Sequence, residues 1–564
     1  MRQKSIFIFH LYKNMDFNNV ISNKYAQGVL IGSFLYNFKG NISGIIDTAR
    51  NVKTFVFFYK FFNARDIFQN QIQMGFKMLS ILPCVKRKIA IEMNKNIETI
   101  SDDLSQHSEQ IVKLIDYKIP ITTFNKEGIE AYRIVETLQK LKAFDDSIVD
   151  KGKVSGTIYS NNKDVETMIN QISSLYFKTN PLHPDIFPSL RYIEKWLIQK
   201  TLSLFKGNID CRGSITSGGT ESIFLACKAY RNYHKSIKNP EIIAPETVHP
   251  AFDKACECLS IKLVKVPIEY CHNGTESSKL NLSYYKSKIN ENTICLVGSA
   301  PSFPHGEIDP MREIGKLGMY YKIPVHMDCC LGGFLLPFLD LNERYDFTMP
   351  GITSISADFH KYAYCEKGIS IVMYKNFKYS NSQYFIYDSW NGGIYATNTL
   401  LGSRSGNIIV LTWATMLLNG TNYYKEASNI IRDTTQKIAY RINQIDGLDV
   451  IGNPEELINI VAIKSDIFDI YKINELLKKN GWNLNALQFP SSIHLCVTLN
   501  HISEEKIDEL IAFLNVGAMD YENMLINDAD SAGGGSIYGT SQKISNRSLV
   551  SNIACQYLDI LYKS

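Results

Sequence analysis

The sequence lacks the patterns that define several large classes of protein. It holds 12 cysteines but no CxxC pair and no His/Cys spacing suited to a structural zinc site, so we expect no metal. Its formal net charge is only +4, and it has no block rich in Lys and Arg, which argues against a nucleic-acid-binding protein. The lysine of a P-loop is missing, so a nucleoside triphosphate is not favoured. Unpatterned cysteines in a chain of this size favour a reducing compartment.

A bilayer-spanning run of about 20 apolar residues is also missing. The first hundred residues contain two shorter apolar stretches, VLIGSFLY (29–36) and KTFVFFYKFF (53–62), and they lack the order of a signal peptide. Two interpretations stay open for residues 1–98. They form amphipathic helices packed on the body of the protein, or they contact a membrane surface.

What is present is typical of a globular protein with more than one domain. The chain has 564 residues, of which 45% are hydrophobic and 21% charged. Short apolar runs at 241–244, 261–268, 293–300, 322–328, 354–356 and 368–374 read as buried strands, with helical patterns such as 221–235 and 309–320 between them. This alternation predicts an α/β fold, a mostly parallel central sheet with helices on both faces.

The strand pattern also suggests domain limits. We expect an N-terminal segment at 1–98, a helical region at 99–209, a large domain at 210–415 and a smaller C-terminal α+β domain at 416–564. In the last of these, 456–465 and 491–500 are predicted strands, and INELLKKN and EEKIDELIAFL are predicted helices.

Four motifs near predicted strand ends could carry chemistry. TSGGTES (216–222) precedes a helix, and its glycines let the backbone approach an anion at the helix N-terminus. A glycine turn with a Thr or Ser cap would look the same. KIPVHMD (322–328) ends in Asp328, a buried acid that needs a partner such as a protonated ring nitrogen; an N-cap or a salt bridge is the alternative.

Lys361 follows the strand at 354–356, where partial burial favours the free amine that attacks a carbonyl. The ordinary alternative is a structural lysine whose methylene groups pack against the protein while its amine reaches solvent. His249 follows the strand at 241–244 and could stack on an aromatic ring, although singly it is more simply a structural histidine. Pyridoxal phosphate uses all four features together: a phosphate cradle, a ring partner, a carboxylate and a lysine.

With these motifs the chain resembles fold-type I pyridoxal-phosphate enzymes of the group II decarboxylase branch, and within it the sphingosine-1-phosphate lyase family. The matching segments span roughly residues 110–564 and include NPLHPDIFPS (180–189), TSGGTESIFLACKAYR (216–231), HMDCCLGGFLLPF (326–338), SISADFHKY (354–362) and GGGSIYG (533–539). This sequence departs from the family pattern at Cys329, where alanine is usual, and at Glu366, where proline is usual.

The resemblance implies roles for individual residues. Lys361 would hold the cofactor covalently, Asp328 would keep its ring nitrogen protonated, and His249 would stack on its ring. The implied cofactor contacts are Gly218, Gly219, Thr220, His249, Asp328, His360, Lys361, Gly402 and Ser403, with Gly402 and Ser403 reaching it from a second subunit of a homodimer. The implied substrate-phosphate contacts are Tyr159, Asn180, His183 and Lys367.

The resemblance also implies an activity: retro-aldol cleavage of a phosphorylated sphingoid base to a long-chain aldehyde and phosphoethanolamine. An amino-acid decarboxylase on the same cofactor site is the nearest alternative, and a catalytically silent scaffold is another. The implied location faces the cytosol, either as a soluble enzyme or at the endoplasmic-reticulum membrane.

Overall fold

The computed structural model describes residues 109–115, 127–149, 152–270, 277–519 and 547–562. The chain divides into the units Met1–Ile91 and Glu92–Ser564, and all described residues belong to the second. The apolar stretches at 29–36 and 53–62 and the segment at 533–539 lie outside the described residues. Within the described part, no helix combines the length and apolar character that a membrane span requires.

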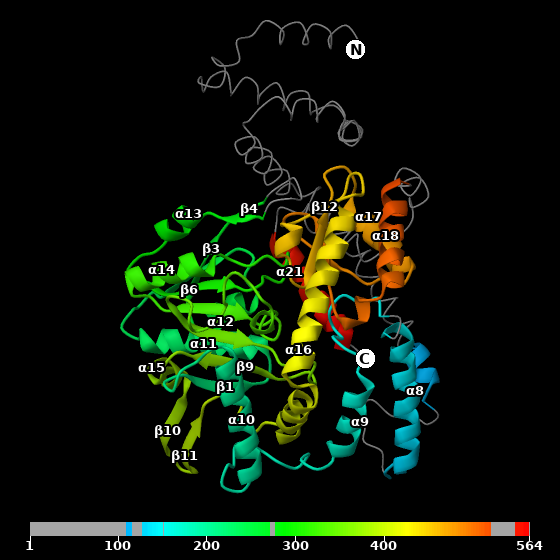
Figure 1. Cartoon of the computed structure of the whole chain (residues 1–564). Coiled ribbons are helices and arrows are strands. Elements are labelled where there is room, and N and C mark those ends of the chain that lie inside the picture. The colour runs from blue at the N-terminus through cyan, green and yellow to red at the C-terminus, as the bar shows by residue number, and fades with distance from the viewer. Residues whose placement is uncertain (1–108, 116–126, 150–151, 271–276, 520–546, 563–564) are drawn as a thin grey trace, which may run out of the picture. The chain divides into compact units, whose positions relative to one another are not determined.

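A seven-stranded sheet forms the centre of the large domain (Figure 1). Its spatial order is β1-β9-β8-β7-β6-β2-β3. The pairs from β8 to β3 run parallel, whereas β9 is antiparallel to both β8 and β1. The strands are β1 (Arg212–Thr216), β2 (Glu241–Pro245), β3 (Lys262–Val266), β6 (Thr293–Ser299), β7 (Val325–Cys329), β8 (Ile352–Ala357) and β9 (Ser370–Tyr374). The predicted mostly parallel sheet is therefore confirmed.

Burial explains why the apolar runs become strands. Every residue of β2, β6, β7 and β9 is buried, as expected for strands covered on both faces. The helices that pack against the sheet include α10 (Pro188–Leu204), α11 (Gly219–Tyr233), α12 (Ala251–Cys258) and α14 (Met311–Tyr321). The predicted strand at 261–268 is divided into two, because Pro267 has no N–H to donate to a ladder.

A second, antiparallel sheet lies in the C-terminal part of the chain, in the order β12-β13-β15-β14. Its strands are β12 (Asp449–Val450), β13 (Ile460–Lys464), β14 (Asn485–Leu487) and β15 (Ser492–Cys496), and α17 (Ile470–Lys479) and α18 (Glu504–Met519) accompany it. The long helix α16 (Gly406–Ile442) contains a kink at Gly420, whose φ of 66° is not helical. The predicted domain limit at 415/416 falls inside α16 and stays a prediction.

The remaining described elements are short or peripheral. They are α8 (Ala131–Val149), α9 (Lys163–Ile172), α13 (Leu282–Ser287), α15 (Phe377–Ser380), α21 (Arg547–Tyr562), the pair β4 (Ile268–Glu269) and β5 (Lys279–Leu280), the hairpin β10 (Phe385–Trp390) and β11 (Gly393–Thr397), and four 3-10 turns at 336–338, 381–383, 454–456 and 499–501. The hairpin was not predicted, although its alternating aromatic residues are typical of strands.

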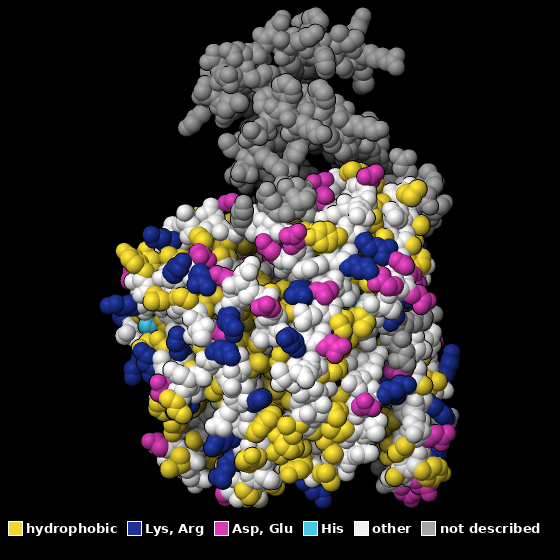
Figure 2. Space-filling model, in the orientation of Figure 1, with side chains coloured by type: hydrophobic (Ala, Val, Ile, Leu, Met, Phe, Trp, Pro, Cys, Tyr) yellow, Lys and Arg dark blue, Asp and Glu magenta, His cyan; other side chains and the backbone are white. Residues whose placement is uncertain are grey.

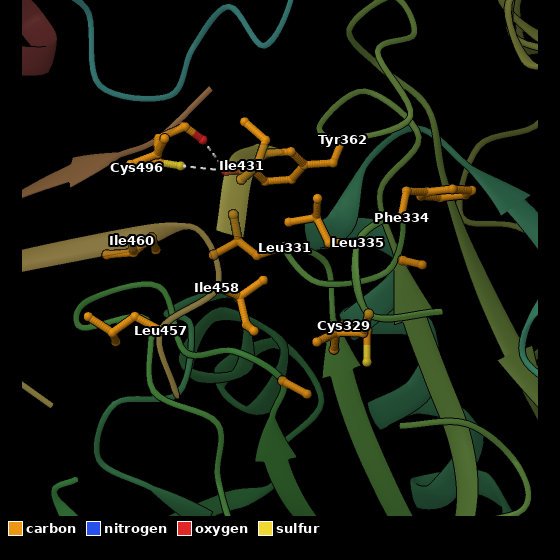
Figure 3. Close-up of a cluster of buried hydrophobic side chains, with 14 of the residues drawn as sticks. Cys329, Leu331, Phe334, Leu335, Tyr362, Ile431, Leu457, Ile458, Ile460 and Cys496 are labelled. Carbon is orange, nitrogen blue, oxygen red and sulfur yellow. Dashed lines mark hydrogen bonds between the residues drawn. The ribbon is translucent and has the colours of Figure 1, made fainter. Parts of the chain in front are cut away.

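The core connects the two sheets. Figure 3 shows Tyr362 directed toward Cys496 of β15 within a cluster of buried side chains. The Tyr362 hydroxyl donates to the backbone oxygen of Val497 at 2.7 Å and lies 3.3 Å from the Cys496 sulfur. The segment that follows β8 is thus anchored to the smaller sheet on one side and to the larger sheet on the other.

Candidate active site

The site begins where two neighbouring parallel strands end. Asp328 is the fourth residue of β7, and β8 ends at Ala357, four positions before Lys361. The register places Asp328 opposite Ser356 of β8. Carboxyl ends of parallel strands lie at the same edge of a sheet, which is where ligands bind in folds of this type. Topology therefore brings the predicted acid and the predicted lysine to one edge.

Asp328 is held by hydrogen bonds on a buried strand. It is 5% exposed, and its Oδ1 accepts from the backbone N–H of Cys330 and from the Ser356 hydroxyl, both at 3.0 Å. Ser356 also lies 3.3 Å from Nε2 of His326, whose Nδ1 is 2.7 Å from Ser354. Burial lowers the pKa of His326 to about 4, so this histidine is neutral. His326 and Ser356 orient the carboxylate through neutral contacts.

Lys361 forms an ion pair with Asp358 that was not predicted from the sequence. Its Nζ lies 3.0 Å from Oδ2 of Asp358, a residue that is 3% exposed. Burial alone would lower the pKa of Lys361, but the Asp358 carboxylate raises it overall. We expected burial to favour the free amine; before any reaction, the structure instead favours the ammonium form.

Two glycines of the TSGGTES motif occupy positions that disfavour a side chain, one because of its backbone conformation and one because of its close neighbours. Gly218 precedes α11 with a φ of 156° and a ψ of 169°, a region that L-residues rarely enter. A Cβ at Gly219 would lie 2.8 and 2.9 Å from the two carboxylate oxygens of Asp358 and 2.9 Å from the Cys330 sulfur. The predicted cradle, Lys361 and the strand end of Asp328 therefore lie around one space.

Glu221, in the first turn of α11, connects this cradle to a distant loop. Its Oε2 accepts from the N–H of Ser217 at 2.6 Å and from the Ser217 hydroxyl at 2.7 Å. Its Oε1 accepts from the N–H of Leu400 at 2.8 Å. The loop of Leu400 leads directly to Gly402 and Ser403, so one buried carboxylate fixes both segments predicted to hold the cofactor phosphate.

Lys367 and Tyr159 lie next to the Lys361 segment. Lys367 donates to the backbone oxygen of His360 at 3.0 Å, and its Nζ lies 4.5 Å from the centre of the Tyr159 ring. Partial burial, then the charge of Lys361, lowers the pKa of Lys367 to about 8. Burial raises the pKa of Tyr159, so its hydroxyl stays a hydrogen-bond donor near neutral pH. His360 is held by Ile369, whose backbone oxygen lies 2.8 Å from Nδ1.

A second group of predicted residues gathers around Asn180. The Asn180 amide donates to the Ser403 hydroxyl at 2.9 Å, and its oxygen accepts from the N–H of Arg404 at 3.3 Å. His183, exposed, donates its backbone N–H to the oxygen of Asn180 at 3.2 Å. An open cavity of about 280 Å³ lies here, and its lining includes Leu182, Thr399, Gly402 and Arg404.

His249 is the predicted residue whose role the geometry supports least directly. Its Nδ1 accepts from the N–H of Ala251 at 3.1 Å, and its ring meets Phe303 edge-on at 6.4 Å. Both contacts are those of a structural histidine at the start of α12. The stacking of His249 on a cofactor ring stays a prediction.

Two contributors to the site were missed in the sequence. Asp358 stands three positions before Lys361, a spacing that brings side chains together in one turn, and this was the available signal. Glu221 stands four positions after Ser217 inside the TSGGTES motif, but nothing in the sequence indicated its contact with Leu400.

The residues present fit pyridoxal phosphate. The glycines at 218 and 219 leave backbone approachable where a side chain would block it. Asp328 is a buried carboxylate at a strand end, suited to a ring N–H.

Comparison with known proteins identifies the relatives of this chain. A family model described as the pyridoxal-dependent decarboxylase conserved domain matches residues 156–461. Sphingosine-1-phosphate lyase 1 of Rattus norvegicus is 39% identical over 505 residues, which cover 88% of this chain and 85% of the rat protein. The sphingosine-1-phosphate lyase of Dictyostelium discoideum is 35% identical over 524 residues, or 92% of this chain and 95% of that protein.

Solved structures agree with this relationship. A sphingosine-1-phosphate lyase from Burkholderia pseudomallei superposes with a TM-score of 0.66 at 29% identity, covering 73% of this chain and 98% of that one. A glutamate decarboxylase from Lactobacillus brevis, at 19% identity and a TM-score of 0.60, covers 72% of this chain and 96% of its own and shares the fold. The chain therefore belongs to the pyridoxal-dependent decarboxylase family and, within it, to the sphingosine-1-phosphate lyases.

Proposed function

We propose that this protein cleaves phosphorylated sphingoid bases to a long-chain aldehyde and phosphoethanolamine, as a carbon–carbon lyase that uses pyridoxal phosphate. The observation that carries the proposal is the convergence of Lys361, Asp328 and the Gly218–Gly219 cradle at one sheet edge, in a chain that belongs to the lyase family. The bound cofactor supplies an electron sink for the pair released when the carbon–carbon bond breaks.

The residues of this chain have separate tasks in the proposal. Lys361 binds the cofactor covalently and yields it to the substrate amine. Asp328, oriented by Cys330 and Ser356, would hold the proton on the ring nitrogen. Gly218, Gly219 and Thr220 would hold the cofactor phosphate, His360 would contact the cofactor, and His249 would stack on its ring. Because each group is fixed by its backbone or by hydrogen bonds, little reorganisation accompanies the reaction.

The substrate phosphate distinguishes a lyase from a decarboxylase of amino acids. Lys367 lies beside Tyr159, and below about pH 8 it offers a positive charge with a neighbouring hydroxyl donor. Lys367 donates to the backbone oxygen of His360, and within the described residues no ion pair joins it to Glu366, the acid at the usual proline position. We assign Tyr159, Lys367, Asn180 and His183 to the substrate phosphate.

A homodimer with shared active sites completes the proposal. Hydrophobic side chains gather on the lower part of the face in Figure 2, where α10, α16 and the β10–β11 hairpin lie in Figure 1. On the hairpin, Ile386 and Trp390 are exposed and Ile394 is 77% exposed. An apolar surface of this kind is typical of a protein interface. It continues along the chain through Leu400 to Gly402 and Ser403, the residues assigned to the partner's cofactor phosphate.

The direct test incubates the purified protein, loaded with pyridoxal phosphate, with a phosphorylated long-chain base. We expect a fatty aldehyde and phosphoethanolamine in equal amounts, and no CO2 from amino acids. Lys361→Ala should abolish turnover and the borohydride-trapped cofactor together. Lys367→Ala should lower turnover while the visible absorption of the bound cofactor persists. Release of CO2 without aldehyde would contradict the proposal.

We propose a protein that faces the cytosol, in solution or at the endoplasmic-reticulum membrane, with any membrane contact made by residues 1–98. These residues lie outside the described part of the chain, so the support is the membrane solubility of the proposed lipid substrate. Flotation of the full chain with vesicles, compared with a variant that starts at residue 99, would separate the two alternatives.

A further inference from the structure

The Asp358–Lys361 ion pair has no role in the function proposed so far. The two residues are three positions apart in the turn after β8, and Oδ2 of Asp358 lies 3.0 Å from Nζ of Lys361. The acid is 3% exposed, so this pair is not one of the solvated surface pairs that contribute little. A buried pair of this kind is screened little by water, so the Asp358 carboxylate acts strongly on the lysine charge.

The carboxylate of Asp358 packs closely against neighbouring groups. A Cβ at Gly219 would lie within 2.9 Å of both Asp358 oxygens, so the carboxylate rests directly against the backbone of α11. His360 Nε2 lies 3.5 Å from the same Oδ2 that meets Lys361. Asp358 is therefore a fixed negative charge at the position where the lysine amine must react.

Among the titratable groups of the described residues that face Lys361, Asp358 is the one with a negative charge. These groups are Asp358, His360 and Lys367 on the same segment, Tyr159 before α9, Cys330 after β7 and Cys496 of β15. Burial raises the pKa of Tyr159, Cys330 and Cys496 and lowers that of His360, so all four are uncharged near neutral pH. Lys367 is positive there and opposes a second positive charge at Lys361.

We propose that Asp358 is the counter-ion of Lys361 and holds it as an ammonium group, directed at the site, whenever its nitrogen is not bonded to the cofactor. This inference rests on the assignment of Lys361 as the cofactor lysine. Asp358 is a positioning residue in this scheme, because it acts through Lys361.

An ammonium group at this position can donate a proton after the carbon–carbon bond has broken. A proton moves from Nζ to the substrate carbon that lost its bond partner, and the electron pair on that carbon forms the new C–H bond. The N–H bond that breaks leaves its pair on nitrogen, so the same step turns Lys361 into a neutral amine. That amine is the nucleophile that recovers the cofactor. A lysine left neutral by burial could not donate this proton.

The first test needs no substitution. Lysines of the full chain, stripped of cofactor, are labelled with trace acetic anhydride across a pH series, and the peptide that contains Lys361 and Lys367 is quantified by mass spectrometry. We expect Lys367 to react with a midpoint near pH 8 and Lys361 with a midpoint above the roughly 10.4 of an ordinary lysine. A midpoint for Lys361 below that of an ordinary lysine would overturn the proposal.

The second test removes the charge and keeps the shape. In Asp358→Asn, the labelling midpoint of Lys361 should fall by about 1–3 pH units, and covalent cofactor attachment, trapped with borohydride, should extend to lower pH by the same amount. The control is Asp346→Asn, which alters another buried acid, one that accepts from the N–H of Thr348 at 2.8 Å. An unchanged midpoint in Asp358→Asn would overturn the proposal.

The two assignments fail in different ways. If Lys361 is not the cofactor lysine, borohydride traps no cofactor on the wild-type residue, while the labelling midpoint still shifts in Asp358→Asn. If Asp358 is not the counter-ion, wild-type trapping succeeds and the midpoint stays unchanged.

Discussion

Lys367, which we assign to the substrate phosphate, shows how the surroundings of one side chain could set a pH dependence of substrate binding. Its pKa is lowered to about 8, first by partial burial and then by Lys361. The lysine therefore carries its charge below pH 8 and loses it above. The phosphate of the proposed substrate has a second pKa of about 6, so it is mostly a dianion around pH 8. Attraction between the two is then present below pH 8 and lost as the pH rises through it.

We predict that KM for the phosphorylated base rises above pH 8 while kcat changes less, because the lost charge contributes to substrate binding. A pH series of steady-state kinetics checks this. In Lys367→Met the rise should be absent, and KM should be high at every pH. A wild-type KM that stays constant from pH 7 to pH 9 would remove Lys367 from the phosphate site.

Gly219 is a second residue whose surroundings leave no room for a side chain. In Gly219→Ala the new Cβ would overlap the Asp358 carboxylate and the Cys330 sulfur. We expect a loss of about 1–3 kcal/mol of stability and a loss of trapped cofactor, measured by thermal unfolding and by borohydride reduction. Gly128→Ala, where no atom lies within 4 Å of the added carbon, should change neither quantity.

At the scale of elements, Glu221 joins the start of α11 to the loop that carries Gly402 and Ser403. Its three hydrogen bonds to Ser217 and Leu400 are all shorter than 2.9 Å and involve a charged acceptor, the stronger kind. We predict that Glu221→Ala weakens cofactor affinity by about tenfold or more, with a smaller loss in Glu221→Gln. Titration of the stripped protein with pyridoxal phosphate, followed by absorbance, checks the prediction.

The matched control for this change is Glu313, which also stands in the first turn of a helix, α14, and so shares the favourable interaction with the helix dipole. Glu313→Ala removes that interaction without breaking a contact between two segments, and its cofactor affinity should equal that of the wild type. Equal affinities in Glu221→Ala and Glu313→Ala would show that the loop is held by other contacts.

Helices and strands were the features that the sequence predicted best. The strands β2, β6, β7, β8 and β9 follow from runs of buried apolar residues, and Asp328 and Lys361 could be placed at strand ends from the same runs. The sequence did not reveal β1 or the β10–β11 hairpin. The contact of Glu221 with Leu400 could not be predicted, because these residues come close only after the chain folds. The charge state of Lys361 could not be predicted either, because it depends on the balance between burial and the neighbouring Asp358 carboxylate.

At the scale of the whole molecule, the exposed apolar residues of the β10–β11 hairpin predict a homodimer interface. A double change, Ile386→Asp with Ile394→Asp, places charge on the apolar surface and should convert a dimer into a monomer in light scattering. Turnover should fall in parallel, since Gly402 and Ser403 would no longer reach a partner. Ile209→Asp, at an isoleucine that is 90% exposed and lies outside the hairpin, is the control and should remain dimeric. A fully active monomer would contradict the shared site.

The hydrogen bond between Asn180 and Ser403 joins a residue assigned to the substrate with one assigned to the cofactor. Any redesign toward a non-phosphorylated amine that replaces Asn180 would deprive the Ser403 hydroxyl of its amide donor, so we expect a change in selectivity to alter cofactor retention as well. Directed-evolution libraries should therefore vary positions 180 and 403 as a pair.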